Sequence, residues 1–261
     1  MIKSVAAIMF STTAIAVPAT RGGPGPSIEA ESLGRTRLDA PWRELVNMSA
    51  APVSRYGIAR TKRAVDVVGA AVLLVLLAPV MALIALVIRS NDGGPVLVGH
   101  TRVGRGGTSF RCLKFRSMTV NAEAVLAPIL REDPAAFEEW ARTRKLRCDP
   151  RVTSPGRILR ATSLDEIPQL LNVLRGEMSL VGPRPVVAEE VLQHYGASAA
   201  PYYLAVRPGI TGLWQISGRS TRSYAERVAL DIDYVRRMSL RQDLVILART
   251  VAVVLTRRGA Y

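Results

Sequence analysis

The segment SLDEIPQLLNVLRGEMSLVGPRP, Ser163–Pro185, decides how this chain is organised. It places two adjacent carboxylates, Asp165 and Glu166, among four arginines: Arg157, Arg160, Arg175 and Arg184. Guanidinium groups make bidentate, charge-assisted hydrogen bonds to phosphate oxygens, so this composition is typical of a phosphate-binding pocket. A carboxylate inside such a pocket can attack phosphorus or hold a metal ion against the phosphate charge. The segment therefore predicts phosphoryl chemistry.

The same pair of acids also has a purely structural interpretation. Ser163 to Glu166 matches a capping box, in which Ser163 begins a helix and Glu166 bonds back to its amide. Pro168 argues against a regular helix here, because a proline just past the first turn removes a helical hydrogen bond. A helix that begins nearer Glu166 leaves Asp165 at its mouth. The spacing alone leaves both the helix cap and the catalytic pair open.

The charge balance calls for an anionic partner. The 261 residues include 35 Lys and Arg against 21 Asp and Glu, a formal net charge of +14. This excess favours phospholipid, nucleic acid or a phosphorylated substrate. Aromatic residues are only 5% of the chain and do not alternate with basic ones, so we predict no nucleic-acid partner.

Cysteine and histidine offer little material for other chemistries. Cys112 and Cys148 have no metal-ligand spacing, and two cysteines make a poor disulfide framework, which favours a reducing cytoplasm. His100 and His194 are the only histidines, so a zinc site or a Ser-His-Asp triad has almost no residues to draw on, and both histidines are interpreted as structural.

Residues 61–90 form the predicted membrane segment, and residues 1–60 a flexible extension. The first 17 residues resemble a signal peptide, but export would separate a phosphate pocket from nucleotide substrates. The stretch from Val67 to Ile88 contains no charged residue and is long enough to cross a bilayer. Pro79 interrupts this run, and basic residues flank both ends. Both ends are therefore expected on the cytoplasmic side, with a turn near Pro79; the alternative is a kinked transmembrane helix.

The remaining residues, 91–261, are predicted to form one cytoplasmic domain. Residues 95–103 and 108–115 form a hairpin around the glycines at 104–107, with Lys114 and Arg116 on one face or on a solvated edge. Residues 121–146 form a helix interrupted near Pro134. Residues 149–160 are interpreted as a turn. Residues 206–219 are interpreted as a glycine-rich loop that covers a phosphate or a base; the alternative is a loop stabilised only by its own turns. A last helix, 240–256, begins after the cap Ser239.

In this order the motifs resemble the bacterial sugar transferases, which are monotopic polyprenyl-phosphate phosphoglycosyl transferases. The resemblance covers about residues 61–261 and is greatest to the exopolysaccharide branch. The matching motifs are KRAVDVVG (62–69), GPVLVGHTRVGRGG (94–107), KFRSM (114–118), DPRVT (149–153), LRATSLDEIPQLLNVLRGEMSLVGPRP (159–185), RPGITGLWQISGR (207–219) and LDIDYV (230–235).

The resemblance implies an α/β, mostly helical fold: a re-entrant membrane helix with a small catalytic domain and a short β-hairpin, at the cytoplasmic face of the inner membrane. It implies that Asp165 attacks the β-phosphorus of a UDP-sugar, releases UMP and carries an aspartyl phospho-sugar that undecaprenyl phosphate accepts. Glu166 would assist as a base, and both acids would border Mg²⁺. The matching phosphate positions are Lys114, Arg160 and Arg184; the nucleotide-side positions are Arg207, Gln215, Arg219 and Asp231; the helix break is Pro79.

The branch implies transfer of a hexose-1-phosphate, galactose by preference and glucose as the alternative, to start exopolysaccharide synthesis. Membrane lipid is an expected partner, and a homo-oligomer is compatible with the sequence. Ala78 precedes Pro79 where many members have serine, and His100 stands where many have glutamine. A non-catalytic membrane-bound assembly factor is the other alternative, against which the intact Asp165–Glu166 pair argues.

Overall fold

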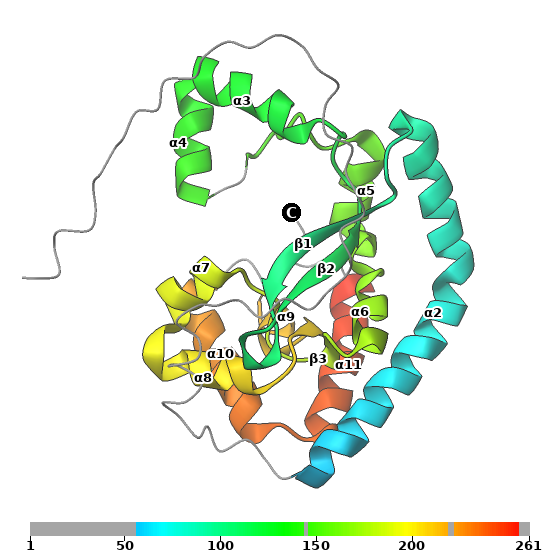
Figure 1. Cartoon of the computed structure of the whole chain (residues 1–261), viewed down its shortest axis with the longest axis vertical. Coiled ribbons are helices and arrows are strands. Elements are labelled where there is room, and N and C mark those ends of the chain that lie inside the picture. The colour runs from blue at the N-terminus through cyan, green and yellow to red at the C-terminus, as the bar shows by residue number, and fades with distance from the viewer. Residues whose placement is uncertain (1–55, 144–145, 219–221, 256–261) are drawn as a thin grey trace, which may run out of the picture. The chain divides into compact units, whose positions relative to one another are not determined.

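A long helix, α2 (Tyr56–Asp92), runs along one side of a mostly helical domain (Figure 1). The computed structural model describes residues 56–143, 146–218 and 222–255. The predicted extension therefore lies outside the described residues except for 56–60, which are helical. Within the described part, Arg60–Asp92 is long and apolar enough to cross a membrane, with a mean hydropathy of 3.1 over its most apolar window.

Pro79 does not end α2. The helix continues through it to Asp92, and its ribbon is curved rather than broken (Figure 1). The predicted interruption of the helix is thus wrong as a break in secondary structure. One missing hydrogen bond is tolerated in a long helix when packing holds both halves, and here Leu77 and Met81 on either side of Pro79 both pack on the domain.

The predicted hairpin is confirmed. Strands β1 (Leu97–Val103) and β2 (Ser109–Phe115) pair antiparallel, with Val103 opposite Ser109. A short 3₁₀ turn at Arg105–Gly107 connects them, and Gly106 has φ +68°, a left-handed conformation that favours glycine. The hairpin crosses the middle of the domain (Figure 1).

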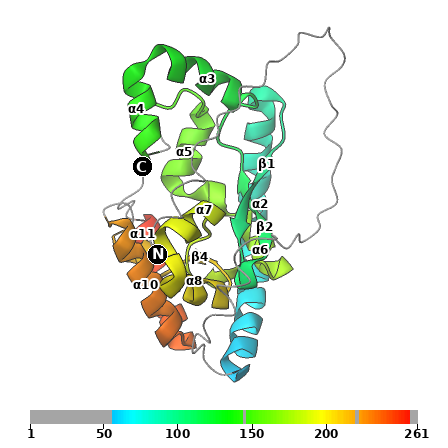
Figure 2. The same ribbon diagram turned by 60° about the vertical axis from the view of Figure 1, so that its left-hand side comes forward.

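Helices α3 (Ala122–Glu132) and α4 (Pro134–Thr143) form a pair at one end of the fold (Figure 2). The predicted interruption near Pro134 is confirmed, because Asp133 has an extended backbone and its carboxylate accepts hydrogen bonds from the amides of Ala135 and Ala136. No described residue of α3 is buried, so this pair is a surface feature.

The segment 149–160 is non-helical only up to Thr153 and is a helix from Ser154, so its interpretation as a turn is wrong for the second part. Helix α5 (Ser154–Thr162) begins after Thr153, whose hydroxyl accepts a hydrogen bond from the Gly156 amide at 3.0 Å. Pro155 in the first turn is compatible with a helix start. A short 3₁₀ turn, η2 (Leu164–Glu166), and helix α6 (Gln169–Arg175) follow.

A second small sheet joins two glycine-rich segments. Strands β3 (Ser179–Val181) and β4 (Gly209–Thr211) pair parallel, with Ser179 opposite Gly209. A Cβ at Gly209 would lie 2.1 Å from the Gly182 nitrogen, so only glycine allows this approach. The pairing turns residues 182–185 and the start of helix α9 (Leu213–Ile216) towards each other.

The remaining helices close the domain. They are α7 (Ala188–Glu190), a π-helical turn η3 (Val191–Tyr195), α8 (Gly196–Ala205), α10 (Tyr224–Arg237) and α11 (Leu240–Leu255). The predicted last helix and its cap are confirmed, since the Gln242 amide donates to the Ser239 hydroxyl at 3.2 Å.

Helix α2 belongs to the hydrophobic core of this domain. Ala70 packs with a central cluster that includes Phe110, Leu170 and Tyr234. Ile84 and Ile88 pack with Phe115 and Leu159 in a second cluster. Burying an isoleucine side chain contributes about 1.5–3 kcal/mol, so the apolar inner side of α2 holds it firmly against the domain.

Candidate active site

Asp165 and Glu166 lie in the tight turn η2, between α5 and α6. The preceding Ser163 has a left-handed backbone, with φ +57° and ψ +16°, and its side chain makes no capping bond. The capping-box interpretation is therefore wrong. The turn buries Asp165, which is 7% exposed, while Glu166 remains partly exposed. Adjacent acids thus have different environments.

Among the described residues, Lys114 on β2 is the cation that pairs with both acids. Its Nζ lies 2.6 Å from Glu166 Oε1 and 3.5 Å from Asp165 Oδ2. The side chains of all three are only partly exposed, at 24%, 26% and 11%. The hairpin therefore delivers one ammonium group to both carboxylates, and Lys114 does not lie on a solvated edge.

Burial raises the pKa of the Asp165 carboxyl above its ordinary value. Lys114 opposes this rise, the negative charge of Glu166 adds to it, and Arg160 opposes it more weakly. The ionised carboxylate is thus kept out of water and stabilised by cations instead. A desolvated carboxylate in this setting is more nucleophilic than one in water.

A hollow of about 370 Å³, open solvent included, lies beside Glu166. Cations and neutral hydrogen-bonding groups dominate its walls, while Asp165 is not among the lining residues. The lining residues are His100, Arg102, Cys112, Lys114, Glu166, Gln169, Arg184, Pro185, Ile210 and Gln215. The hairpin, α6, the 182–185 turn and α9 each contribute, so residues from across the sequence meet here.

The two predicted phosphate arginines lie at different distances from this hollow. Arg184 lines it and is exposed, with its guanidinium 5.6 Å from the centre of the Trp214 ring. Arg160 on α5 donates from Nε to the Ser117 hydroxyl at 2.9 Å, which keeps it near the acidic pair but outside the lining.

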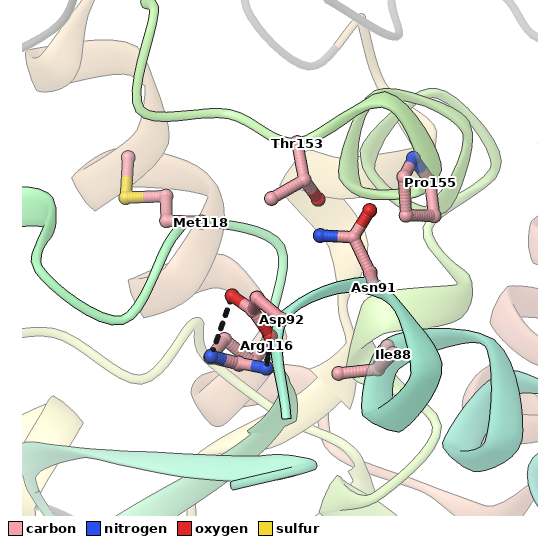
Figure 3. Close-up of a pocket in the computed structure, with 7 residues that line it drawn as sticks. All are labelled: Ile88, Asn91, Asp92, Arg116, Met118, Thr153 and Pro155. Carbon is pink, nitrogen blue, oxygen red and sulfur yellow. Dashed lines mark hydrogen bonds and ion pairs between the residues drawn. The ribbon is translucent and has the colours of Figure 1, made fainter. Parts of the chain in front are cut away.

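Arg116 is not on the same side as Lys114, so the prediction that they share a face is wrong. Figure 3 shows Arg116 facing Asp92 at the end of α2, in a shallow depression lined also by Ile88 and Thr153. One guanidinium nitrogen lies 2.9 Å from Asp92 Oδ2, and the other bonds the second oxygen. Strand alternation fails here because β2 ends at Phe115.

The structure brings only one of the next three predicted nucleotide-side residues, Arg207, Gln215 and Arg219, to the hollow. Gln215 lines the hollow. Arg207 instead donates from Nε to the Gly176 carbonyl at 2.8 Å, at the end of α6 and outside the lining residues. Arg219 lies outside the described residues.

Asp231 is buried on α10 behind Arg184. It is 3% exposed, and the Tyr195 hydroxyl donates to its Oδ2 at 2.6 Å. Burial raises the pKa of Asp231 to about 7, against the opposing effects of the Tyr195 bond, Arg184 and Arg227. It does not line the hollow, and Arg184 is the lining residue whose charge affects its pKa.

Because of this raised pKa, Asp231→Asn is predicted to increase the stability of the folded protein by an amount that depends on pH. Between pH 3.8 and about 7 the folded chain keeps a proton that the unfolded chain has lost, so wild-type stability falls as pH rises through this window. The neutral amide avoids that loss, worth at most about 4 kcal/mol. We expect the thermal unfolding midpoint of the variant to exceed that of wild type by several degrees at pH 8, and by little near pH 4.

Asp233→Asn is the matched control for that comparison. Asp233 lies two residues along the same helix, is 40% exposed and pairs with Arg237 on the surface. Its substitution should change the midpoint by little at either pH. A pH-independent effect of Asp231→Asn would contradict the assigned pKa.

Six lining residues were not predicted as site residues: His100, Arg102, Cys112, Gln169, Pro185 and Ile210. His100 was interpreted as structural, yet it lies in the wall, where burial and neighbouring cations lower its pKa and keep the imidazole neutral. Strand alternation could have indicated that His100 and Arg102 belong to the site together, since positions 100 and 102 share a face of β1. Gln169 follows the acidic pair in sequence and is 2% exposed.

The donor set of the site fits a magnesium ion that substrate helps to bind. Among the described residues no group of three or more acidic, histidine or cysteine side chains is placed to hold a metal. Mg²⁺ commonly uses one or two carboxylates together with substrate phosphates, and Asp165 and Glu166 supply such a pair.

Comparison with known proteins places these features in a family. A family model described as bacterial sugar transferase matches residues 58–257. Exopolysaccharide production protein ExoY of Rhizobium meliloti (strain 1021) is 54% identical over 200 residues, 77% of this chain and 88% of the relative. The undecaprenyl-phosphate galactose phosphotransferase of Salmonella typhimurium (strain LT2) is 49% identical over 77% of this chain and 41% of its own. The UDP-glucose:undecaprenyl-phosphate glucose-1-phosphate transferase of Caulobacter vibrioides is 43% identical over 80% of this chain and 75% of its own.

The matched range contains α2 from Ile58 onward, the acidic pair and every residue that lines the hollow. The chain therefore belongs to the bacterial sugar transferase family.

Proposed function

We propose that this protein transfers a hexose-1-phosphate from a UDP-sugar to undecaprenyl phosphate, the first step of exopolysaccharide synthesis. The observation that carries the proposal is the buried Asp165 carboxylate beside Glu166, with Lys114 3.5 Å and 2.6 Å from the two acids at a cation-lined hollow. Relatives named for this kind of transfer support it.

The transfer takes place in two displacements at one phosphorus. An oxygen of Asp165 attacks the β-phosphorus of the UDP-sugar and forms a P–O bond. The bond from that phosphorus to the bridging oxygen breaks, and UMP leaves with the electron pair. A phosphate oxygen of undecaprenyl phosphate then attacks the aspartyl phospho-sugar. The Asp165 carboxylate departs unchanged, and the product is an undecaprenyl diphosphate-sugar. No histidine is needed, because a carboxylate is already ionised at neutral pH.

The cations around the hollow neutralise the charge that these steps gather. Phosphoryl transfer depends mainly on positioning and charge neutralisation. Lys114 reaches both acids, Arg184 faces the hollow, and Arg160 lies behind the acidic pair. We assign phosphate contacts to these three. Gln215 is assigned to the nucleotide side, with Asp231 holding Arg184 electrostatically from behind.

Asp165 and Glu166 would also hold Mg²⁺, which supplies further neutralisation of the diphosphate when bound. Glu166 is the more exposed of the two acids and accepts the Lys114 hydrogen bond. It orients that ammonium and provides a base at the edge of the hollow.

Packing of α2 supports attachment to one leaflet rather than a crossing. Residues spaced three or four apart face the domain along the helix: Asp66, Ala70, Leu74, Leu77, Met81, Ile84 and Ile88. A crossing helix needs about 20 residues in hydrocarbon, whereas this inner side contacts the domain from Asp66 to Ile88. Its other side exposes apolar residues to lipid: Val65, Val68, Val72, Leu73, Val75, Leu76, Val80, Leu83, Leu86 and Val87. We place the domain at the cytoplasmic face of the inner membrane.

Galactose is the proposed sugar, and glucose the alternative, since relatives named for each match this chain. The deciding experiment presents purified membranes with a panel of UDP-sugars and undecaprenyl phosphate, and measures UMP release. We expect release with UDP-galactose to exceed release with UDP-glucose, and none without enzyme. Release that is equal with and without the polyprenyl phosphate after many turnovers would contradict lipid as the acceptor. No release with any UDP-sugar would overturn the proposed function.

A further inference from the structure

The first turns of α2 reach into the catalytic domain with polar side chains. Lys62 Nζ lies 2.7 Å from Asp243 Oδ2 on α11 and donates to the Val181 carbonyl at 3.1 Å. Asp66 accepts hydrogen bonds from the Ser179 hydroxyl at 2.8 Å and from the Leu180 amide at 3.1 Å. The Tyr234 hydroxyl lies 2.8 Å from Asp243 Oδ1 and 3.0 Å from the Val181 carbonyl. We call Lys62, Asp66, Ser179, Tyr234 and Asp243 the anchor cluster.

The anchor cluster is buried and ionic. Asp66 is 4% exposed and Asp243 5%. Burial raises the pKa of Asp243, and Lys62 is the main opposing influence. Buried ion pairs rarely add much stability over apolar packing, but they fix one arrangement of the groups that make them. Apolar packing already attaches α2, so the cluster is better explained as fixing the register of α2 on the domain.

The elements that α2 contacts here are those that carry the site. Val181, whose carbonyl receives the Lys62 bond, ends β3 and is followed directly by the turn that presents Arg184. The next residue of α2, Arg63, donates to the carbonyls of Val173 and Leu174 at 2.7 and 3.2 Å. These carbonyls belong to α6, which starts three residues after Glu166. Helix α6, which lines the hollow, and strand β3, which leads into the Arg184 turn, are thus both hydrogen-bonded to the first turns of α2.

We infer that the anchor cluster sets the position of Arg184 relative to Asp165, and that Lys62, Asp66 and Asp243 are positioning residues for phosphoryl transfer. The inference rests on the proposed function. It gives α2 a second role besides membrane attachment, because a shift of its register would move β3, and with it the arginine that grips the diphosphate. A misplacement of about 1 Å can lower a rate by about a hundredfold.

The test is the paired variant Lys62→Met/Asp243→Asn in the full chain in membranes. The pair removes one positive and one negative charge, so the net charge of the cluster is unchanged, and the amide oxygen introduced by Asp243→Asn can still accept the Tyr234 hydrogen bond. We expect the protein to remain folded and membrane-bound, with KM for the UDP-sugar raised about tenfold and a smaller change in kcat. The control is Arg241→Met. Arg241 lies on α11, as Asp243 does, but is not part of the anchor cluster, so this change should leave both constants unchanged.

A second comparison separates positioning from loss of folded protein. Arg184→Met should raise KM in the wild-type background and raise it little further in the paired variant, because both changes act on the same contact. If the paired variant does not fold, Tyr234→Phe serves instead: it removes only a hydroxyl and should raise KM about two- to threefold.

Four outcomes count against the inference. Unchanged KM with activity lost in proportion to unfolded protein would show a structural role only. Independent, multiplying effects of Arg184→Met and the paired variant would disconnect the cluster from Arg184. Absence of UMP release by the unaltered chain would overturn the proposed function and this inference with it, whereas normal wild-type release with an unaffected variant overturns the inference alone.

Discussion

Asp165→Asn is expected to abolish UMP release, with a loss of at least about a thousandfold. The amide has nearly the same size as the carboxyl, so the turn η2 can form, but its oxygen is a poor nucleophile towards phosphorus. Asp165 is 7% exposed, and removing its charge relieves a desolvation cost, so the variant should be at least as stable as wild type. The measurement is UMP release from UDP-sugar by purified membranes, beside thermal unfolding of the same samples.

The covalent intermediate gives this prediction a second readout. Wild-type enzyme exposed to UDP-sugar alone should gain the mass of one phospho-hexose on the peptide that contains Asp165. Asp165→Asn should gain none. Glu166→Gln is the matched control, because it changes the adjacent acid and should still form the adduct, about ten- to a hundredfold more slowly. An adduct on another side chain, or activity only when both substrates are present together, would overturn the two-step mechanism.

Features with local signals in the sequence were predictable. The hairpin has glycine-rich turn chemistry between two alternating strands, Pro134 interrupts the helical pattern between α3 and α4, and Ser239 precedes a long apolar periodicity. Each of these depends on residues within a few positions of one another. The fold class, mostly helical with a short hairpin, was implied by the family resemblance, and these local signals agree with it.

Features that depend on contacts between distant segments were not predictable. The parallel pairing of β3 with β4 joins residues about 30 apart through three-residue strands, too short for any periodicity. Lys62 and Asp243 are 181 residues apart. Helix α5 was missed for a different, local reason. Asp149 to Pro155 contains two prolines and is therefore typical of a turn, yet Thr153 and Pro155 are also favourable residues at the start of a helix.

The site was predictable where family motifs coincide with geometry. Glu166, Lys114, Arg184 and Gln215 do line one hollow, and Asp165 lies 3.5 Å from Lys114. Arg207 lies in a matching motif but donates to the Gly176 carbonyl at the end of α6 and does not line the hollow. His100 was set aside because a lone histidine is usually structural, whereas its position on β1 decides its surroundings.

Lys114→Met is the second large-effect prediction, because Lys114 is the one described cation paired with both acids. We expect kcat/KM for UMP release to fall about a hundredfold, as charge stabilisation of the transferred phosphoryl group is lost. The losses of activity caused by Lys114→Met and by Glu166→Gln should not multiply in the double variant. Glu166 lies 2.6 Å from the Lys114 ammonium, so removing both groups leaves neither of these two charges without its partner. Lys114→Arg keeps the charge and should lose less than the methionine variant. Independent effects of the Lys114 and Glu166 substitutions, or an inactive arginine variant beside an active methionine variant, would show that Lys114 does not neutralise charge at the acidic pair.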